Sequence, residues 1–141
     1  MKFINRHIFG LLTIALITIL SLMPAQEFPQ VDVQFADKWT HWLMYGFLTA
    51  VLGIEVIGHS RRRKAHCAEQ GTQGRTRYIP KFFLIFLFSC MFGGLMELGQ
   101  AYLTTTRSGE WLDFLANSFG ALCSTIVLCI YVSTVKEKDK I

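Results

Sequence analysis

Four long stretches of the sequence are almost entirely apolar, and polar or charged segments separate them. The stretches cover residues 8–23, 39–57, 82–98 and 114–132. A soluble domain would alternate apolar and polar positions with a period of 3.6 or 2, whereas these blocks are continuous and approach the length that a helix needs to cross a bilayer. We therefore predict an all-α polytopic membrane protein, a four-helix transmembrane bundle with helices at about residues 5–23, 38–57, 80–101 and 110–133.

The composition fits a single membrane domain. Hydrophobic residues make up 52% of the 141 residues and charged residues 17%, and most charges lie outside the apolar blocks. Two separate domains would each be too small to bury much surface. We therefore expect one domain over residues 1–141.

The basic residues predict the orientation of the chain. Twelve of the 14 lysines and arginines lie before the first block, between the second and third blocks, or after the fourth. Cytoplasmic segments of membrane proteins are enriched in these residues, so both termini and residues 58–78 are expected in the cytoplasm. Residues 58–78 show no apolar periodicity and are predicted to be a flexible basic loop. Because the basic residues flank membrane blocks, we expect no nucleic-acid partner.

The first block has a second interpretation. Residues 1–26 combine a basic start, an apolar core and a small residue, Ala25, which together are typical of a signal peptide. Met23 is large for the position three residues before such a cut. We therefore expect a retained first helix.

Three polar stripes lie at the helix ends that are predicted to face outward. Within each stripe the polar residues are three or four positions apart, which places them on one helix face. An ionisable side chain inside a membrane costs about 2.5–3.5 kcal/mol on insertion scales, so we expect the stripes to meet and pair in an outward-facing polar cup. The residues assigned to this site are Asp37, Lys38, His41, Tyr45, Glu97, Gln100, Arg107, Asp113 and Asn117.

Each polar residue also has a purely structural interpretation. Asp37 and Asp113 can cap a helix or complement its dipole, and Glu97 can pair with Arg107. The shared site is favoured because all of these groups are predicted at one side of the membrane. On the other side the sequence offers only Glu55, which is expected to reach water or the arginines that follow it.

Read in order, the polar residues form three motifs. They are Asp37-Lys38-x-x-His41-x-x-x-Tyr45, then Glu97-x-x-Gln100, then Arg107-Ser-Gly-Glu-x-x-Asp113-x-x-x-Asn117-x-x-Gly120. This ordered set, over about residues 35–130, resembles the VanZ-like membrane protein family. The resemblance implies a small multi-pass protein of the bacterial cytoplasmic (inner) membrane, in a family named for a member linked to reduced susceptibility to the glycopeptide teicoplanin. It implies no settled biochemical activity.

Three functions fit the predicted cup. A binding protein would hold a lipid or lipid-linked head group at the outer leaflet, a drug or an envelope partner. The alternative is a hydrolase or transferase acting on such a lipid, with His41, Glu97 and Asp113 as candidate acid-base groups, although the sequence contains no G-x-S-x-G nucleophile motif. A transporter is disfavoured because no inverted repeat is evident. The binding protein is our prediction, and an oligomer is compatible with it.

No cofactor is predicted. A metal bound by His41 with Asp37, Glu97 or Asp113 is a minority alternative, because a single histidine is a weak metal signal. The four cysteines have no C-x-x-C spacing and no outward-facing pair, so they are expected to be small hydrophobic residues in the bundle.

Overall fold

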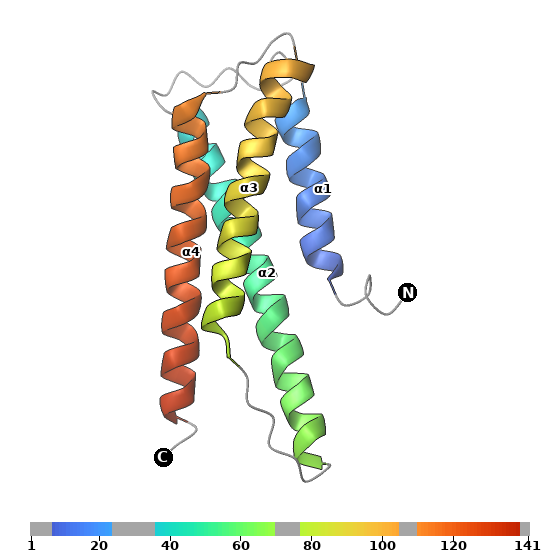
Figure 1. Ribbon diagram of the computed structural model, residues 1–141, viewed down its shortest axis with the longest axis vertical. Coiled ribbons are helices and arrows are strands. Elements are labelled where there is room, and N and C mark those ends of the chain that lie inside the picture. The colour runs from blue at the N-terminus through green and yellow to red at the C-terminus, as the bar shows by residue number, and fades with distance from the viewer. Residues whose placement is uncertain (1–6, 24–35, 70–76, 105–109, 139–141) are drawn as a thin grey trace.

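The computed structural model describes residues 7–23, 36–69, 77–104 and 110–138, and over these ranges it contains helices and no strand (Figure 1). The helices are α1 (Ile8–Leu22), α2 (Ala36–Glu69), α3 (Ile79–Leu103) and α4 (Trp111–Lys138). Three of them, α2, α3 and α4, are long and apolar enough to cross a membrane, whereas α1 has 15 residues. The all-α architecture is thereby confirmed, and three of the four predicted spans are helices long and apolar enough to cross a membrane. The predicted span at residues 5–23 is not among them.

The helices run up and down, so that α2 and α4 begin at the end of the bundle where α1 and α3 finish (Figure 1). The polar stripes lie at the start of α2, the finish of α3 and the start of α4. The topology therefore brings all three stripes to one end of the molecule.

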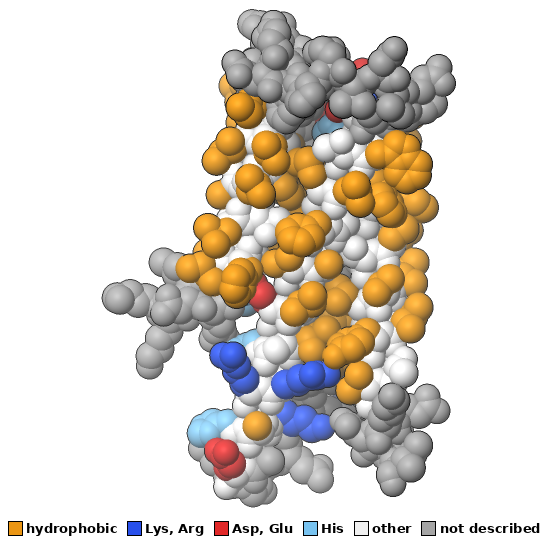
Figure 2. Space-filling model, turned by 180° about the vertical axis from the view of Figure 1, so that it is seen from behind, with side chains coloured by type: hydrophobic (Ala, Val, Ile, Leu, Met, Phe, Trp, Pro, Cys, Tyr) orange, Lys and Arg blue, Asp and Glu red, His pale blue; other side chains and the backbone are white. Residues whose placement is uncertain are grey.

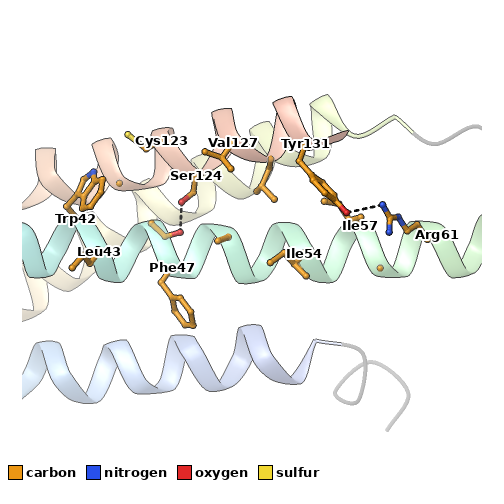
Figure 3. A pocket seen from close by; sticks show the side chains of 15 residues that line it. Trp42, Leu43, Phe47, Ile54, Ile57, Arg61, Cys123, Ser124, Val127 and Tyr131 are labelled. Atoms are coloured by element: carbon orange, nitrogen blue, oxygen red, sulfur yellow. Dashed lines mark hydrogen bonds between the residues drawn. The ribbon is translucent and has the colours of Figure 1, made fainter. Parts of the chain in front are cut away.

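Helices α2 and α4 pack closely because small residues lie between them. A Cβ atom on Gly120 would lie 2.1 Å from the backbone oxygen of Trp42. The hydroxyl of Ser124 donates a hydrogen bond of 2.7 Å to the backbone oxygen of Gly46 (Figure 3). Small residues at these positions allow the two backbones to approach, as is common between membrane helices.

The bundle interior contains two apolar clusters. One comprises Ile17, Tyr45 and Leu48, and the other comprises Ile57, Phe82, Leu128 and Val132. Within the bundle the Thr49 hydroxyl donates to the Ser89 hydroxyl at 2.9 Å.

Many of the exposed side chains in the described helices are large and hydrophobic. Figure 2 shows hydrophobic side chains over most of the visible face and Lys and Arg side chains gathered at its lower end. We call this second group the basic end. Its described members are all exposed, and they are Arg61, Arg62, Arg63, Lys64, Arg77 and Lys81. A broad apolar surface with charges at the end suits a lipid environment.

Helix α1 is joined to the rest of the bundle by polar contacts. Near its C-terminus, Gln100 Nε2 donates to the backbone oxygen of Ser21 at 3.0 Å. At its N-terminus, the backbone N–H of Gly10 donates to Glu55 Oε1 at 3.0 Å, and His7 Nδ1 lies 3.3 Å from Glu55 Oε2. The expectation that Glu55 would reach water or the arginines is therefore wrong. It occupies the N-terminus of α1, where the helix dipole favours a carboxylate.

Helix α2 does not stop at residue 57. It continues to Glu69, so the first part of the predicted loop 58–78 is helical, while residues 70–76 lie outside the described ranges. Arginine, lysine, alanine and glutamate have good helix propensity, and His66 pairs with Glu69 at 3.7 Å across one turn. Low hydrophobicity in this segment therefore did not mark the end of the helix. Asp37 lies in the first turn of α2, where a carboxylate complements the helix dipole.

Candidate functional site

Charged and polar side chains from α2, α3 and the start of α4 contact one another at one end of the bundle. His41 (4% exposed), Glu97 (7%), Asp113 (3%) and Asn117 (0%) are buried despite their polarity. Burying a polar group costs free energy unless it is hydrogen-bonded or paired, so these four side chains need partners. We call it the acidic end, and its members are Asp37, Lys38, His41, Glu97, Glu110, Asp113 and Asn117.

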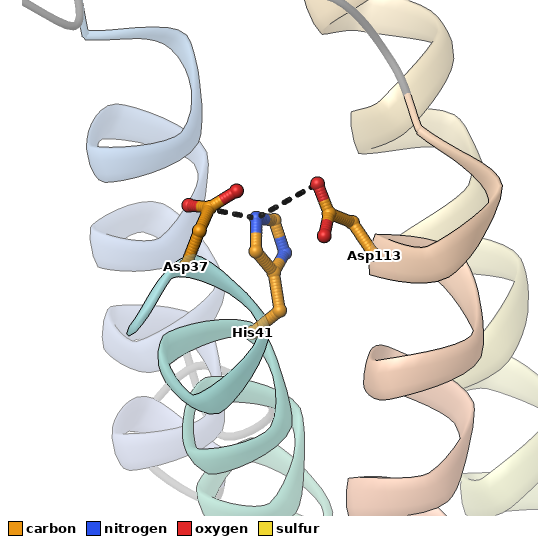
Figure 4. A group of neighbouring side chains, drawn as sticks. All are labelled: Asp37, His41 and Asp113. Atoms are coloured by element: carbon orange, nitrogen blue, oxygen red, sulfur yellow. Dashed lines mark ion pairs between the residues drawn. The ribbon is translucent and has the colours of Figure 1, made fainter. Parts of the chain in front are cut away.

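His41 lies at the centre of the acidic end (Figure 4). Its Nε2 atom is 3.8 Å from Asp37 Oδ1 and 3.9 Å from Asp113 Oδ2. Its Nδ1 atom is 3.1 Å from Asn117 Oδ1. The imidazole is therefore oriented by an amide on one side and two carboxylates on the other.

The contacts of Asn117 favour a proton on Nδ1 of His41. Its Nδ2 donates to Glu97 Oε1 at 3.1 Å, so its Oδ1 is the acceptor that faces His41. Nδ1 of His41 must then be the donor, and in the neutral imidazole the lone pair lies on Nε2. That lone pair points toward the two aspartates.

Glu97 connects α3 to α4. Its Oε1 accepts the Asn117 amide and also lies 3.6 Å from His41 Nδ1. Its Oε2 accepts the backbone N–H of Glu110 at 3.3 Å. Both oxygens of this carboxylate therefore have donors, one of them the backbone that leads into α4.

Lys38 joins the buried and the exposed parts of the acidic end. Its Nζ lies 2.5 Å from Asp113 Oδ1 and 2.6 Å from Glu110 Oε2. The side chains of Asp37 and Glu110 are 60% and 51% exposed, so the network opens to its surroundings through these two carboxylates.

Negative charge exceeds positive charge among the described residues of the acidic end. The site contains one ammonium, from Lys38, and one imidazole, from His41. It contains four carboxylates, which belong to Asp37, Glu97, Glu110 and Asp113. A site with this balance attracts cationic groups.

The structure brings together most of the residues that the sequence assigned to the site. Of the three candidate acid-base groups, His41 lies within 4 Å of both Glu97 and Asp113. Asp37, Lys38 and Asn117 each contact one or more of them. Glu110 was missed as a site residue. Its signal was its position in the motif before Asp113, at the same end as the oppositely charged Lys38.

Two predicted residues, Gln100 and Tyr45, lie outside the network. Gln100 is buried, and its amide bonds to α1. Tyr45 is fully buried with its ring centroid 6.0 Å from that of Phe92, and its hydroxyl has no hydrogen-bond partner among the described residues. Arg107 lies outside the described residues.

One group of side chains has the donor set of a metal site. Single ligand atoms of Asp37, His41 and Asp113 all lie within 4.8 Å of one another. One imidazole and two carboxylates suit a divalent transition metal. The Lys38 ammonium, however, already contacts Asp113, so the carboxylates have a cation beside them without a metal.

Comparison with family models, with curated proteins and with solved structures finds no match for this chain.

Proposed function

We propose that this protein is a multi-span membrane protein of the bacterial cell envelope, and that its acidic end binds the ammonium group of a lipid or lipid-linked head group. One observation carries the proposal. Asp113 and Glu110 already hold an ammonium, that of Lys38, at 2.5 and 2.6 Å. Beside it, Asp37 and the Nε2 atom of His41 converge with the second oxygen of Asp113, and Asp37 is open to the surroundings.

The charge distribution supports an outward position for this end. The exposed arginines and lysines of the basic end lie at the opposite end of the bundle, and such residues favour the cytoplasmic side. The acidic end then faces the outer leaflet, and both termini are cytoplasmic. The ordered motifs that resemble the VanZ-like family support an envelope role and a link to teicoplanin susceptibility, which growth of a deletion strain in teicoplanin would test.

The chemistry of the site favours an ammonium that carries N–H groups. A primary ammonium can donate to the lone pair on His41 Nε2 and to the carboxylates of Asp37 and Asp113. A trimethylated ammonium has no N–H to donate. Hydrogen bonds to charged groups contribute about 1.5–3 kcal/mol, which is tenfold or more in affinity.

The test uses native mass spectrometry of the purified chain with equimolar phosphatidylethanolamine and phosphatidylcholine of identical acyl chains. We expect retention of phosphatidylethanolamine to exceed that of phosphatidylcholine about tenfold. Asp37→Asn should remove most of this preference without unfolding the protein, because Asp37 is exposed. Equal retention of the two lipids by the wild-type chain would refute the proposal.

The second candidate function is an enzyme acting on the same class of lipid. It is favoured by the orientation of His41, whose Nε2 lies between two carboxylates as a general acid or base would. His41→Gln, Glu97→Gln and Asp113→Asn, made singly, should then abolish turnover of a lipid-linked substrate while retention of phosphatidylethanolamine largely persists. If turnover and retention fall together, the site binds and does not catalyse.

A further inference from the structure

A long apolar groove lies between α2 and α4, away from the acidic network, and one charged side chain lines it (Figure 3). Its volume is about 910 Å³. Along α2 it extends from Trp42 to Arg61. At 1.5 Å per residue this is about 28 Å, close to the roughly 30 Å thickness of the hydrocarbon core of a bilayer. The groove therefore runs along the apolar surface for nearly the depth of a membrane.

The layout of the groove determines which kind of molecule fits it. Its lining is mostly apolar, and the charged side chain of Arg61 lies at one end of it. A matching occupant has a long apolar part and an anionic group at one end. A phospholipid, with an acyl chain and a phosphate, meets both requirements.

Small residues form the depth of the groove. Gly46, Ala50 and Gly58 line it on α2, and a Cβ atom on Gly58 would find nothing within 4 Å. Exposed apolar side chains such as Ile54 and Val127 border it. A hydrocarbon chain lying here would cover apolar surface on both helices.

Arg61 gives the groove a charged end. Its Nη2 donates to the hydroxyl of Tyr131 at 3.2 Å, and its guanidinium carbon lies 5.8 Å from the centre of the Tyr131 ring. These contacts hold the side chain beside the groove. A guanidinium has five N–H donors and matches the geometry of a phosphate, so the bond to Tyr131 leaves donors for an anion. The exposed Arg62, Arg63 and Lys64 add positive charge next to it.

We propose that this groove binds one acyl chain of an anionic phospholipid, with the phosphate held by Arg61. The lipid belongs to the leaflet opposite the acidic end. This site is separate from the ammonium site, because it lies on other residues and selects the opposite charge.

The test is native mass spectrometry of the purified full chain with equimolar phosphatidylglycerol and phosphatidylcholine of identical acyl chains. The wild type should retain phosphatidylglycerol about tenfold over phosphatidylcholine, as expected for charge-assisted hydrogen bonds. Arg61→Gln should lose most of this preference. Arg62→Gln is the matched control. It removes the same charge at the next position, where the side chain does not line the groove, and it should retain the preference.

A second variant tests the groove itself. Gly58→Phe places a ring in open space and should lower retention of both lipids at least fivefold, whereas Met91→Phe, on an exposed face of α3, should leave retention unchanged. Equal losses in Arg61→Gln and Arg62→Gln would overturn the proposal in favour of general surface charge. The proposal would also be overturned if Gly58→Phe retained both lipids as well as the wild type does. If Gly58→Phe converted a dimer to a monomer, the groove would be assigned to a second copy of the chain, which would overturn the proposal too. Asp37→Asn should leave phosphatidylglycerol retention unchanged, which separates this test from that of the ammonium site.

Discussion

The two ends of the bundle hold charge in opposite ways. At the acidic end, carboxylates and an imidazole from three different elements are buried and bond to one another across the helices. At the basic end the described arginines and lysines are all exposed, and Arg61 and Lys81 each donate a hydrogen bond to a neutral hydroxyl group. A buried charge needs a specific partner in the protein, whereas water can replace the partner of an exposed charge. The acidic end therefore holds the helices together, whereas the side chains of the basic end are available to bind molecules outside the bundle.

The packing of α2 against α4 also differs between the two ends, and it is tighter at the acidic end. Close to the acidic end, Gly120 lies against the backbone of α2, so that even a methyl group has no room. Near the basic end, Gly58 faces open space. Glycine thus allows the two helices to touch at one end and leaves a hollow between them at the other. Substitutions at both ends test this contrast.

The largest effect is expected for Gly120→Ala. The added Cβ would lie 2.1 Å from the Trp42 backbone oxygen, which no side-chain rotation can relieve, so α2 and α4 must separate. Overpacking of this kind costs about 3 kcal/mol. The free energy of unfolding, measured by SDS titration in mixed micelles, should fall by that amount.

The matched control for Gly120→Ala is Gly99→Ala on α3. There the nearest atom to an added Cβ is Leu22 Cδ2 at 3.5 Å, an ordinary contact. Stability should rise by about 0.5–1 kcal/mol, as expected when alanine replaces glycine within a helix without a clash. Equal unfolding midpoints for the two variants would show that the backbones of α2 and α4 do not meet at Gly120.

A smaller loss is expected for Asn117→Leu. Leucine has similar size but neither donates to Glu97 nor accepts from His41, so two buried polar groups lose a partner. An unsatisfied buried group costs about 1–3 kcal/mol, and since Glu97 and His41 keep other contacts we expect a loss of about 2 kcal/mol by the same titration. Arg62→Gln, which removes an exposed charge at the basic end, should stay within about 0.5 kcal/mol. If Asn117→Leu left the free energy of unfolding unchanged, the network would not stabilise the bundle.

The positions of the polar side chains at one end could be predicted from the sequence. Spacing of three or four residues fixes a helix face, and up-and-down topology fixes the depth of each stripe, so His41, Glu97, Asp113 and Asn117 meet as expected. The detailed partners could not be predicted. Gln100 lies one turn beyond Glu97 on the same face, yet it reaches the backbone of α1, because the path of a neighbouring helix is set by packing and leaves no periodic signal.

The length of α2 shows a second limit. Charged residues after position 57 correctly marked the finish of the apolar block, but not of the helix, which continues to Glu69. Hydropathy reports the environment of a segment, whereas hydrogen bonding along the backbone is independent of whether lipid or water surrounds it. The groove likewise had no sequence signature beyond its small residues, since its hollow depends on how far α2 and α4 diverge.

The smallest effect, and the opposite sign, is expected for Gly58→Ala. Position 58 lies inside α2 and an added Cβ meets nothing within 4 Å, so the substitution removes the conformational freedom of glycine without a clash. Replacing glycine by alanine within a helix stabilises by about 0.5–1 kcal/mol, which the SDS titration should detect as a higher midpoint. A methyl group is too small to fill the groove, so retention of phosphatidylglycerol should match the wild type. A loss of stability would mean that the helices close over Gly58, and the contrast with Gly120 would then disappear.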